Sequence, residues 1–350
     1  MEPLPAWAIP LCGGAIGCAI GYAARRARLC IFGALEDAFM AANFRRLKVL
    51  AVALAIAILL TQIMIVSGAL GPETIRYLPL RLPWLSISLG GVMFGFGMAL
   101  VGTCAFGSLV RLGSGDLRSF VTILVYAVAA LAGLRGGLAS FRLGYIESQS
   151  IAMPGGVQAD LAALVSWLVG FDARPAVAVA SGALLLIWAL SKSDIFRTPR
   201  LLASGLMLGI GVAAAWLVTG ALADDMALVV DPEGLTFVAP VADTLRAIAL
   251  PPSTIWTFGI ASVVGVVSGA LLASVLNDEF RWEAFDDQHE MKRHMLGGAI
   301  MGLGGVLAGG CTIGQGITAG SVLALSWPLA VGSMVIGARL GLYYLLRGSG

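Results

Sequence analysis

The sequence predicts an all-α, polytopic membrane protein with inverted-topology repeats, interrupted (re-entrant-like) helices, about nine membrane spans and additional short half-helices. Three observations support this fold class. Hydrophobic residues make up 59% of the 350 positions and charged residues only 12%, whereas soluble domains carry roughly a quarter charged residues. Several apolar runs approach the ~20 residues that a helix needs to cross the hydrocarbon core. Finally, a glycine-rich segment near residue 100 recurs near residue 300.

The expected spans follow from these apolar runs, taken in chain order. The first is not a signal peptide, because Arg25, Arg26 and Arg28 follow it rather than precede it. Two later segments are rich in glycine and are expected to be interrupted helices, 86–112 and 295–325. The remaining spans are expected at 6–24, 47–70, 117–139, 174–191, 200–222, 254–276 and 326–346.

Basic residues gather in three connections between these spans, and by the positive-inside rule these connections are cytoplasmic. The connections at 71–85, 140–173 and 223–253 then lie outside, the N-terminus is periplasmic, and the C-terminus with Arg347 is cytoplasmic. The basic residues of the three clusters are Arg25, Arg26, Arg28, Arg45, Arg46 and Lys48; Lys192, Arg197 and Arg200; and Arg281, Lys292 and Arg293. No basic tract of the kind that binds nucleic acid is present.

An internal repeat contains two of the five cysteines. The segment LGGVMFGFGMALVGTCAFG (89–107) matches LGGAIMGLGGVLAGGCTIG (296–314), 207 positions further on, with Cys104 aligned on Cys311. The expected spans of the two copies run in opposite directions, because the helix expected at 174–191 reverses the sense between them. The chain is therefore divided into a first repeat half (1–140), a periplasmic connection with a linking helix (141–199) and a second, inverted half (200–350). Inverted repeats with interrupted helices are typical of secondary transporters, whose substrate sites lie near the midplane.

The glycines around Cys104 and Cys311 predict that the backbone leaves helical geometry at these two points. Broken backbone at membrane depth is tolerated only when it is buried in protein or lines a polar cavity. Where a second half-helix begins, free N–H groups favour an anion. The candidate residues at these two helix starts are Ala105, Phe106 and Gly107, and Thr312, Ile313 and Gly314.

Other cysteines and glycines have plainer interpretations. Glycines four residues apart, such as Gly17 and Gly21, are typical of close helix packing. Cys12 and Cys18 are expected to be small buried side chains, and the chain contains no CxxC pair. Cys30 precedes a short amphipathic pattern, and its position alone leaves packing and function equally open.

Three motifs resemble the YeeE/YedE family of bacterial inner-membrane proteins: RLCIFGALED around Cys30, GFGMALVGTCAFGSLVRLG around Cys104 and GGAIMGLGGVLAGGCTIGQGITA around Cys311. The resemblance covers almost the whole chain. It implies an hourglass-shaped inverted-repeat fold, uptake of thiosulfate or a related sulfur or selenium compound, and a route lined by Cys30, Cys104 and Cys311. It also implies a TusA-like cytoplasmic sulfur carrier as a partner.

Our hypothesis for the mechanism is that helix-end N–H groups hold the oxygens of thiosulfate while a neutral thiol donates a weak hydrogen bond to its terminal sulfur. Cys30 is expected nearest the cytoplasm, with Cys104 and Cys311 closer to the middle and to each other. No enzyme activity, cofactor or metal is expected. Two alternatives stay open: a membrane thiol enzyme that holds sulfur as a persulfide, and a transporter of soft metals or selenium compounds.

Two groups of charged residues have ordinary explanations. The side chains of Arg111, Arg118 and Arg135 are expected to extend to the membrane interface rather than to bind an anion. The segment DEFRWEAFDDQHEMKRH (278–294) contains His289 and His294 and is expected to be a solvated cytoplasmic connection.

Overall fold

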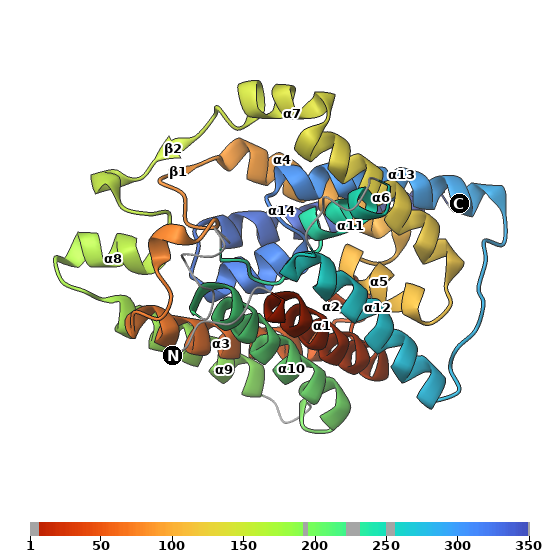
Figure 1. The fold of residues 1–350 in the computed structure, drawn as a ribbon, viewed down its shortest axis with the longest axis horizontal. Helices are drawn as coiled ribbons and strands as arrows, with labels where there is room; N and C mark the ends of the chain where they lie inside the picture. Colours follow the sequence, from red (N-terminus) through yellow and green to blue (C-terminus); the bar gives the residue numbers. More distant parts are fainter. Residues whose placement is uncertain (1–6, 192–194, 222–231, 250–255, 349–350) are drawn as a thin grey trace.

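The computed structural model describes residues 7–191, 195–221, 232–249 and 256–348, and these are helical almost throughout (Figure 1). Lys192 and two parts of the connection expected at 223–253, 223–231 and 250–253, lie outside the described residues. The long helices are α1 (Ala8–Ala27), α3 (Arg45–Val66), α4 (Trp84–Val101), α6 (Leu117–Arg135), α9 (Arg174–Leu190), α10 (Pro199–Trp216), α12 (Phe258–Leu276), α13 (Gln288–Leu307) and α14 (Ser326–Gly348). The shorter helices are α2 (Ile31–Met40), α5 (Ala105–Gly113), α7 (Gly137–Phe141), α8 (Leu161–Val169) and α11 (Ala239–Ala249). Short 3-10 and π-helical segments are η1 (Pro72–Thr74), η2 (Arg142–Ile146), η3 (Pro154–Gly156), η5 (Leu217–Ala221) and η6 (Gly314–Ala319), and the strands β1 (Arg81–Leu82) and β2 (Ile151–Ala152) pair antiparallel.

Seven helices in the described part of the chain are long and apolar enough to cross a membrane, which confirms the predicted class of all-α polytopic membrane protein. They correspond to seven of the nine expected spans. The other two differ in detail: the segment expected at 174–191 is α9, which is shorter at 17 residues. The segment expected at 295–325 is α13 followed by η6, and α13 begins seven residues earlier, at Gln288.

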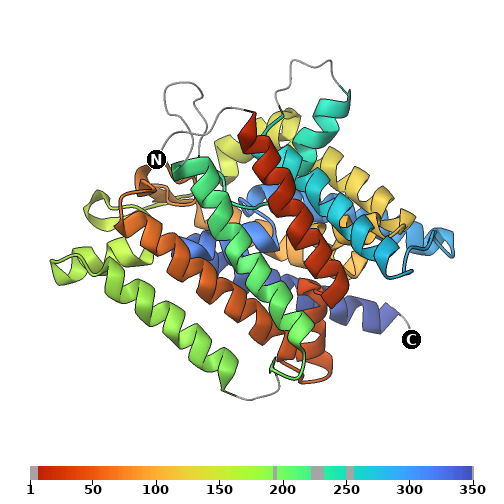
Figure 2. The ribbon, with the colours of Figure 1, turned by 60° about the horizontal axis from the view of Figure 1, so that its bottom comes forward.

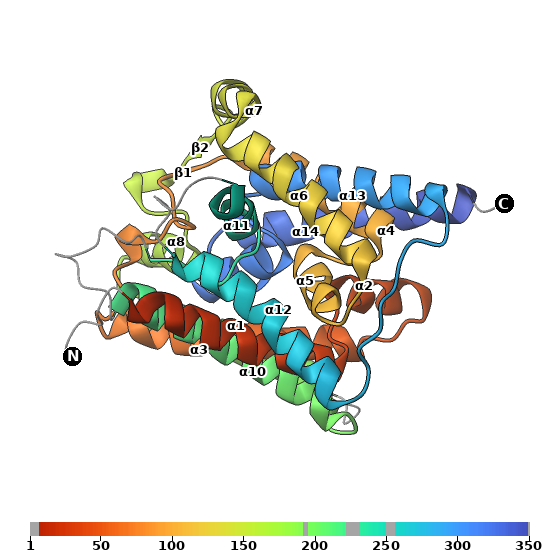
Figure 3. The same cartoon turned by 45° about the vertical axis from the view of Figure 1, so that its right-hand side comes forward.

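The long helices form two groups with short helices between them (Figure 3). In one group α1 packs on α12 and α10, and α3 packs on α10 and α9. Figure 2 shows α1, α10, α3 and α9 crossing the molecule side by side. In the other group α4 packs on α13 and α14, and α6 packs on α13. The short elements α2, α5, α11 and η6 each contact both groups, so they occupy the interior layer.

The contacts between helices keep the same pattern when each element of the first repeat is replaced by its counterpart in the second, and the reverse. The pairs of counterparts are α1 and α10, α2 and α11, α3 and α12, α4 and α13, α5 and η6, and α6 and α14. Under this exchange the contact of α1 with α12 becomes that of α10 with α3, and the contact of α4 with α14 becomes that of α13 with α6. The short elements show the same correspondence, because α5 packs on α12 and η6 packs on α3. Residues before and after the α9 segment thus show the same pattern of contacts, and each helix group combines helices from both.

Glycines allow the helices within each group to touch backbone to backbone. A Cβ atom on Gly17 or Gly21 of α1 would overlap the backbone of Ser262 or Val266 of α12. From the other side, a Cβ on Gly269 would overlap the backbone of Cys18. These glycines therefore serve helix packing, as their spacing predicts, and Cys18 belongs to this contact.

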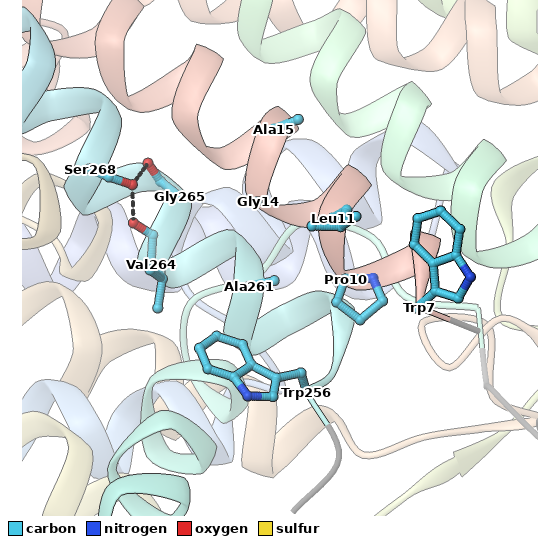
Figure 4. Close-up of a pocket in the computed structure, with 10 residues that line it drawn as sticks. All are labelled: Trp7, Pro10, Leu11, Gly14, Ala15, Trp256, Ala261, Val264, Gly265 and Ser268. Carbon is cyan, nitrogen blue, oxygen red and sulfur yellow. Dashed lines mark hydrogen bonds between the residues drawn. The ribbon is translucent and has the colours of Figure 1, made fainter. Parts of the chain in front are cut away.

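A groove of about 690 Å³ lies on the outer side of the α1–α12 contact. Figure 4 shows Trp7 and Trp256 at one end of it and Ser268 at the other. The Ser268 hydroxyl donates to the carbonyl oxygen of Val264 at 2.6 Å, so this polar group is already satisfied. The lining of the groove is mostly apolar, and it includes none of the three motif cysteines.

Candidate functional site

The two halves break their fourth helix in the same way. Helix α4 ends at Gly102, which has φ 76°, and α5 begins at Ala105 directly after Cys104. In the second half Gly309 has φ 72° and Cys311 precedes the next helical turn. A left-handed backbone angle is costly for residues with a side chain, which explains why both copies place glycine two residues before the cysteine.

At each break the cysteine caps the helix that follows it. The Gly107 N–H donates to the Cys104 Sγ at 3.4 Å, and the Gly314 N–H donates to the Cys311 Sγ at the same distance. The N–H groups of Ala105 and Phe106, and those of Thr312 and Ile313, lie in the first turns, where a helix has no acceptor of its own. Each break therefore places backbone N–H donors beside its thiol.

Cys30 forms a third turn of the same kind. It is the N-cap of α2, and its Sγ accepts the Gly33 N–H at 3.4 Å. The three turns share the pattern Cys-x-x-Gly, as CIFG, CAFG and CTIG. Cys30 lies outside the repeat, and the glycine at the third following position is the sequence signal that relates it to the other two turns.

The three thiols lie near one another in the interior layer. Cys104 and Cys311 are fully buried, and Cys30 is half-buried. The Cys30 Sγ lies 3.7 Å from the Thr103 Oγ1. Thr103 holds Cys30 against the Cys104 turn, and the Cys104 thiol interacts with both Cys30 and Cys311. That Cys104 and Cys311 lie closer to each other than to Cys30 stays a prediction.

In all three turns, polar groups lie close to the position that a Cβ atom would occupy if the glycine carried one. A Cβ on Gly33 would lie 2.8 Å from the guanidinium Nη1 of Arg46, and one on Gly107 would overlap the Thr103 hydroxyl. A Cβ on Gly314 would lie 2.6 Å from the Thr236 Oγ1 and 3.1 Å from the Tyr77 hydroxyl. The glycines thus keep the turns open to hydrogen-bonding side chains.

The Cys311 turn is surrounded by neutral donors. Its thiol accepts the Gly314 N–H, and the N–H groups of Ile313 and Phe237 and the Thr236 hydroxyl lie near it, the hydroxyl without a hydrogen bond to it. Tyr77 lies in the loop between α3 and α4, and burial raises the pKa of its phenol well above the usual value. Its hydroxyl therefore stays protonated at physiological pH and remains a hydrogen-bond donor.

Two hydroxyls at this turn have no hydrogen-bond partner in the described structure. The Thr312 side chain is only 7% exposed, and both its Oγ1 and the buried Oγ1 of Thr236 are unsatisfied. Buried polar groups normally find partners because an unmade hydrogen bond costs about 1–3 kcal/mol. The Thr312 hydroxyl lies near the Cys104 thiol without a hydrogen bond to it, so the two hydroxyls flank the thiol series.

The apolar members of the predicted site support the turns by packing. Ala105 and Ile313 are fully buried, and Phe106 is 1% exposed. The Phe106 ring packs on that of Phe237, with centroids 5.4 Å apart. The side chains of these residues therefore fix the turns, while their backbones supply the donors.

Of the charged residues considered in the sequence, Arg111 donates to the Gly102 carbonyl oxygen at 3.4 Å, while Arg118 and Arg135 form ion pairs elsewhere. Arg135 pairs with Asp243 at 3.0 Å, and Arg118 pairs with Asp116 at 3.1 Å. The segment 278–294 was expected to be a solvated connection, but its last residues belong to a helix. His294 lies in α13, is 6% exposed, and its Nδ1 is 3.4 Å from the Thr122 Oγ1. Across the described residues, no group of three His, Cys, Asp or Glu side chains is arranged to hold a metal ion.

Comparison with known proteins identifies the family of the chain. Residues 26–340 match the model of a family described as "Sulphur transport", and this range includes all three cysteine turns. The chain is similar to the thiosulfate transporter TsuA of Escherichia coli, with 27% identity over 350 residues, 93% of this chain and 92% of the relative. It is also similar to the thiosulfate transporter TsuA of Spirochaeta thermophila, with 25% identity over 349 residues, 95% of this chain and 98% of the relative. The chain therefore belongs to the sulphur-transport family.

Proposed function

We propose that this protein takes up thiosulfate, or a closely related sulfur anion, along a path lined by Cys30, Cys104 and Cys311. The observation that carries the proposal is the meeting of three Cys-x-x-Gly turns in the interior layer between the two helix groups. The similarity to two proteins named as thiosulfate transporters supports the choice of substrate.

The chemistry of these turns suits an anion with both oxygen and sulfur atoms. Burying a charge without compensation is very costly. Here the backbone N–H groups in the first turns after Cys104 and Cys311 supply donors for oxygens, and the neutral thiols supply weak S–H donors for a terminal sulfur. Several weak sites in series hold an ion long enough to desolvate it and release it again, as conduction requires.

The surroundings of the thiols favour hydrogen bonding over covalent catalysis. A nucleophilic cysteine normally has a nearby base or a lowered pKa. The groups around Cys311 are backbone N–H groups and the Thr236 hydroxyl. Of the two histidines, His294 contacts Thr122 and Glu290, and His289 is exposed on α13. A transporter is therefore favoured over a membrane thiol enzyme.

We further propose an inner-membrane location with the Cys30 end of the path facing the cytoplasm and the N-terminus the periplasm. The support is the clustering of Arg25, Arg26, Arg28 and Arg45 around α2, by the positive-inside rule. A cytoplasmic TusA-like carrier is then proposed to receive the sulfur anion at the half-buried Cys30.

Growth on single sulfur sources tests the substrate. A bacterial strain without other uptake systems is expected to grow on thiosulfate only when it carries this protein, and to gain no growth on sulfate. Growth rescue on sulfate alone would contradict the assignment. Metal-dependent rescue would favour the soft-metal alternative.

The role of the thiols is tested by Cys311→Ala. We expect thiosulfate uptake to fall by about tenfold or more, in line with the loss of a hydrogen bond to a buried charge. Immunoblotting of the membrane fraction checks that the variant is expressed. Wild-type uptake at normal expression would remove Cys311 from the path.

A further inference from the structure

Resting on the proposed function, we propose that Tyr77, Thr236 and Thr312 form an oxygen-binding subsite at the Cys311 turn. It takes the oxygens of a sulfur oxyanion through neutral hydroxyl donors, so that it selects anions that carry oxygen atoms.

The first support is the relation between the two halves. Helices α2 and α11 exchange places in the packing, and the chain before them aligns as LCIFGALED (29–37) on LTFVAPVAD (235–243). Leu29 and Leu235 are both buried, and Asp37 and Asp243 are both ion-paired with arginine. In this alignment Thr236 takes the place of Cys30. The path thus has a fourth lining position, with a hydroxyl where the other half has a thiol.

The second support is geometric. The Thr236 Oγ1 and the Tyr77 hydroxyl both approach the place that a Cβ on Gly314 would occupy. Gly314 also donates its N–H to Cys311. Two hydroxyls, a thiol and a helix start therefore converge on one side of this turn, with Thr312 on the side of Cys104.

The third support is that the hydroxyls of Thr236 and Thr312 have no hydrogen-bond partner. Thr312 is more than nine-tenths buried and its hydroxyl has no partner, and the buried Thr236 Oγ1 has none either. By contrast, Thr244 on α11 donates to the carbonyl oxygen of Pro240 at 2.7 Å. Free buried donors beside a thiol are suited to an anion with oxygen atoms, because the bound ion would satisfy them.

The two ends of the path then differ in the hydrogen-bonding groups beside their thiols. The Cys30 turn has the Arg46 guanidinium and the Thr103 hydroxyl close to the thiol. The Cys311 turn has hydroxyls and N–H groups around its thiol. Hydroxyls are stronger donors than thiols, so the Cys311 end is the one that distinguishes oxyanions.

The test uses Thr236→Val, Thr236→Ser and Thr236→Cys, with Thr244→Val as the matched control, in proteoliposomes with ³⁵S-labelled thiosulfate. We expect Thr236→Val to raise KM about tenfold, the loss of one hydrogen bond to an ion. Thr236→Ser keeps the hydroxyl and is expected to keep KM. Thr236→Cys is expected to lie between them, because the thiol is a weaker donor. Thr244→Val is expected to behave as wild type.

A second readout separates binding from structure. Sulfate offers oxygens but no terminal sulfur, and we expect its inhibition of uptake to weaken in Thr236→Val and to be restored in Thr236→Ser. If Thr236→Val does not fold, Tyr77→Phe removes a single oxygen and carries the same expectation. An unchanged KM and unchanged sulfate inhibition in a folded variant would overturn the subsite. Absence of thiosulfate uptake by the wild type would instead overturn the proposed function itself.

Discussion

The Cys104 and Cys311 turns have the same backbone and different surroundings. Both follow a glycine with positive φ, and both thiols accept the N–H of the third following glycine. However, the neighbours of Cys104 are Cys30, Thr103 and Thr312, whereas the neighbours of Cys311 include Thr236 and Tyr77. The repeat therefore provides the geometry of the site, and Cys30, Thr236 and Tyr77, which lie outside the strongest match, contribute to the difference in chemistry.

The largest expected effect comes from filling the Cys311 turn. Gly314→Ala would place a Cβ within 2.6 Å of the Thr236 Oγ1 and displace the hydroxyls around the thiol. We expect uptake to fall by about tenfold or more, because misplacing binding groups by about 1 Å can cost up to 10²-fold. Gly332→Ala on α14 is the control, since nothing lies within 4 Å of its Cβ position. Equal uptake by the two variants would show that the open turn is not needed.

A smaller effect is expected at the opposite end of the path. The Arg46 side chain is 34% exposed and its Nη1 lies 3.4 Å from the Asp37 Oδ2. We expect Arg46→Gln to lower uptake about two- to fivefold, because a partly exposed charge contributes at most about 1 kcal/mol. Uptake rates at low and high salt provide the measurement, since screening reduces the wild-type advantage. A loss that is independent of salt would assign Arg46 a structural role.

The sequence predicted the breaks better than it predicted what surrounds them. Gly102, Cys104, Gly309 and Cys311 were found because the repeat preserves them over nineteen positions. The equivalence of Cys30 and Thr236 was not visible, because the two nine-residue segments share only Leu and Asp at the same positions. Tyr77 lies in an irregular connection, and only the tertiary fold brings its hydroxyl to Gly314.

The shared backbone can be tested apart from the chemistry. Gly309→Ala would hold alanine at φ 72°, and a left-handed residue with a side chain costs about 1–2 kcal/mol. We expect a lower free energy of unfolding and a lower Tm in detergent, measured by tryptophan fluorescence. Gly137→Ala on α7 serves as the control, because its Cβ position is open and its φ is not positive. An unchanged Tm for Gly309→Ala would contradict the strained break.

The smallest effect is expected outside the interior layer. Arg135 is 50% exposed and pairs with Asp243, and such pairs contribute about 0–1 kcal/mol. We expect Arg135→Gln to leave KM for thiosulfate unchanged and to alter stability only slightly. A clear rise in KM would extend the anion path to this arginine and to α11.

The central claim is that the anion passes between the thiols of the interior layer and not along the cysteines of α1. The most direct measurement compares initial rates of ³⁵S-thiosulfate uptake by Cys104→Ala/Cys311→Ala and Cys12→Ala/Cys18→Ala in the same proteoliposomes. We predict that the first double variant loses uptake almost completely and that the second retains the wild-type rate. Retained uptake in the first variant, or equal losses in both, would contradict the claim.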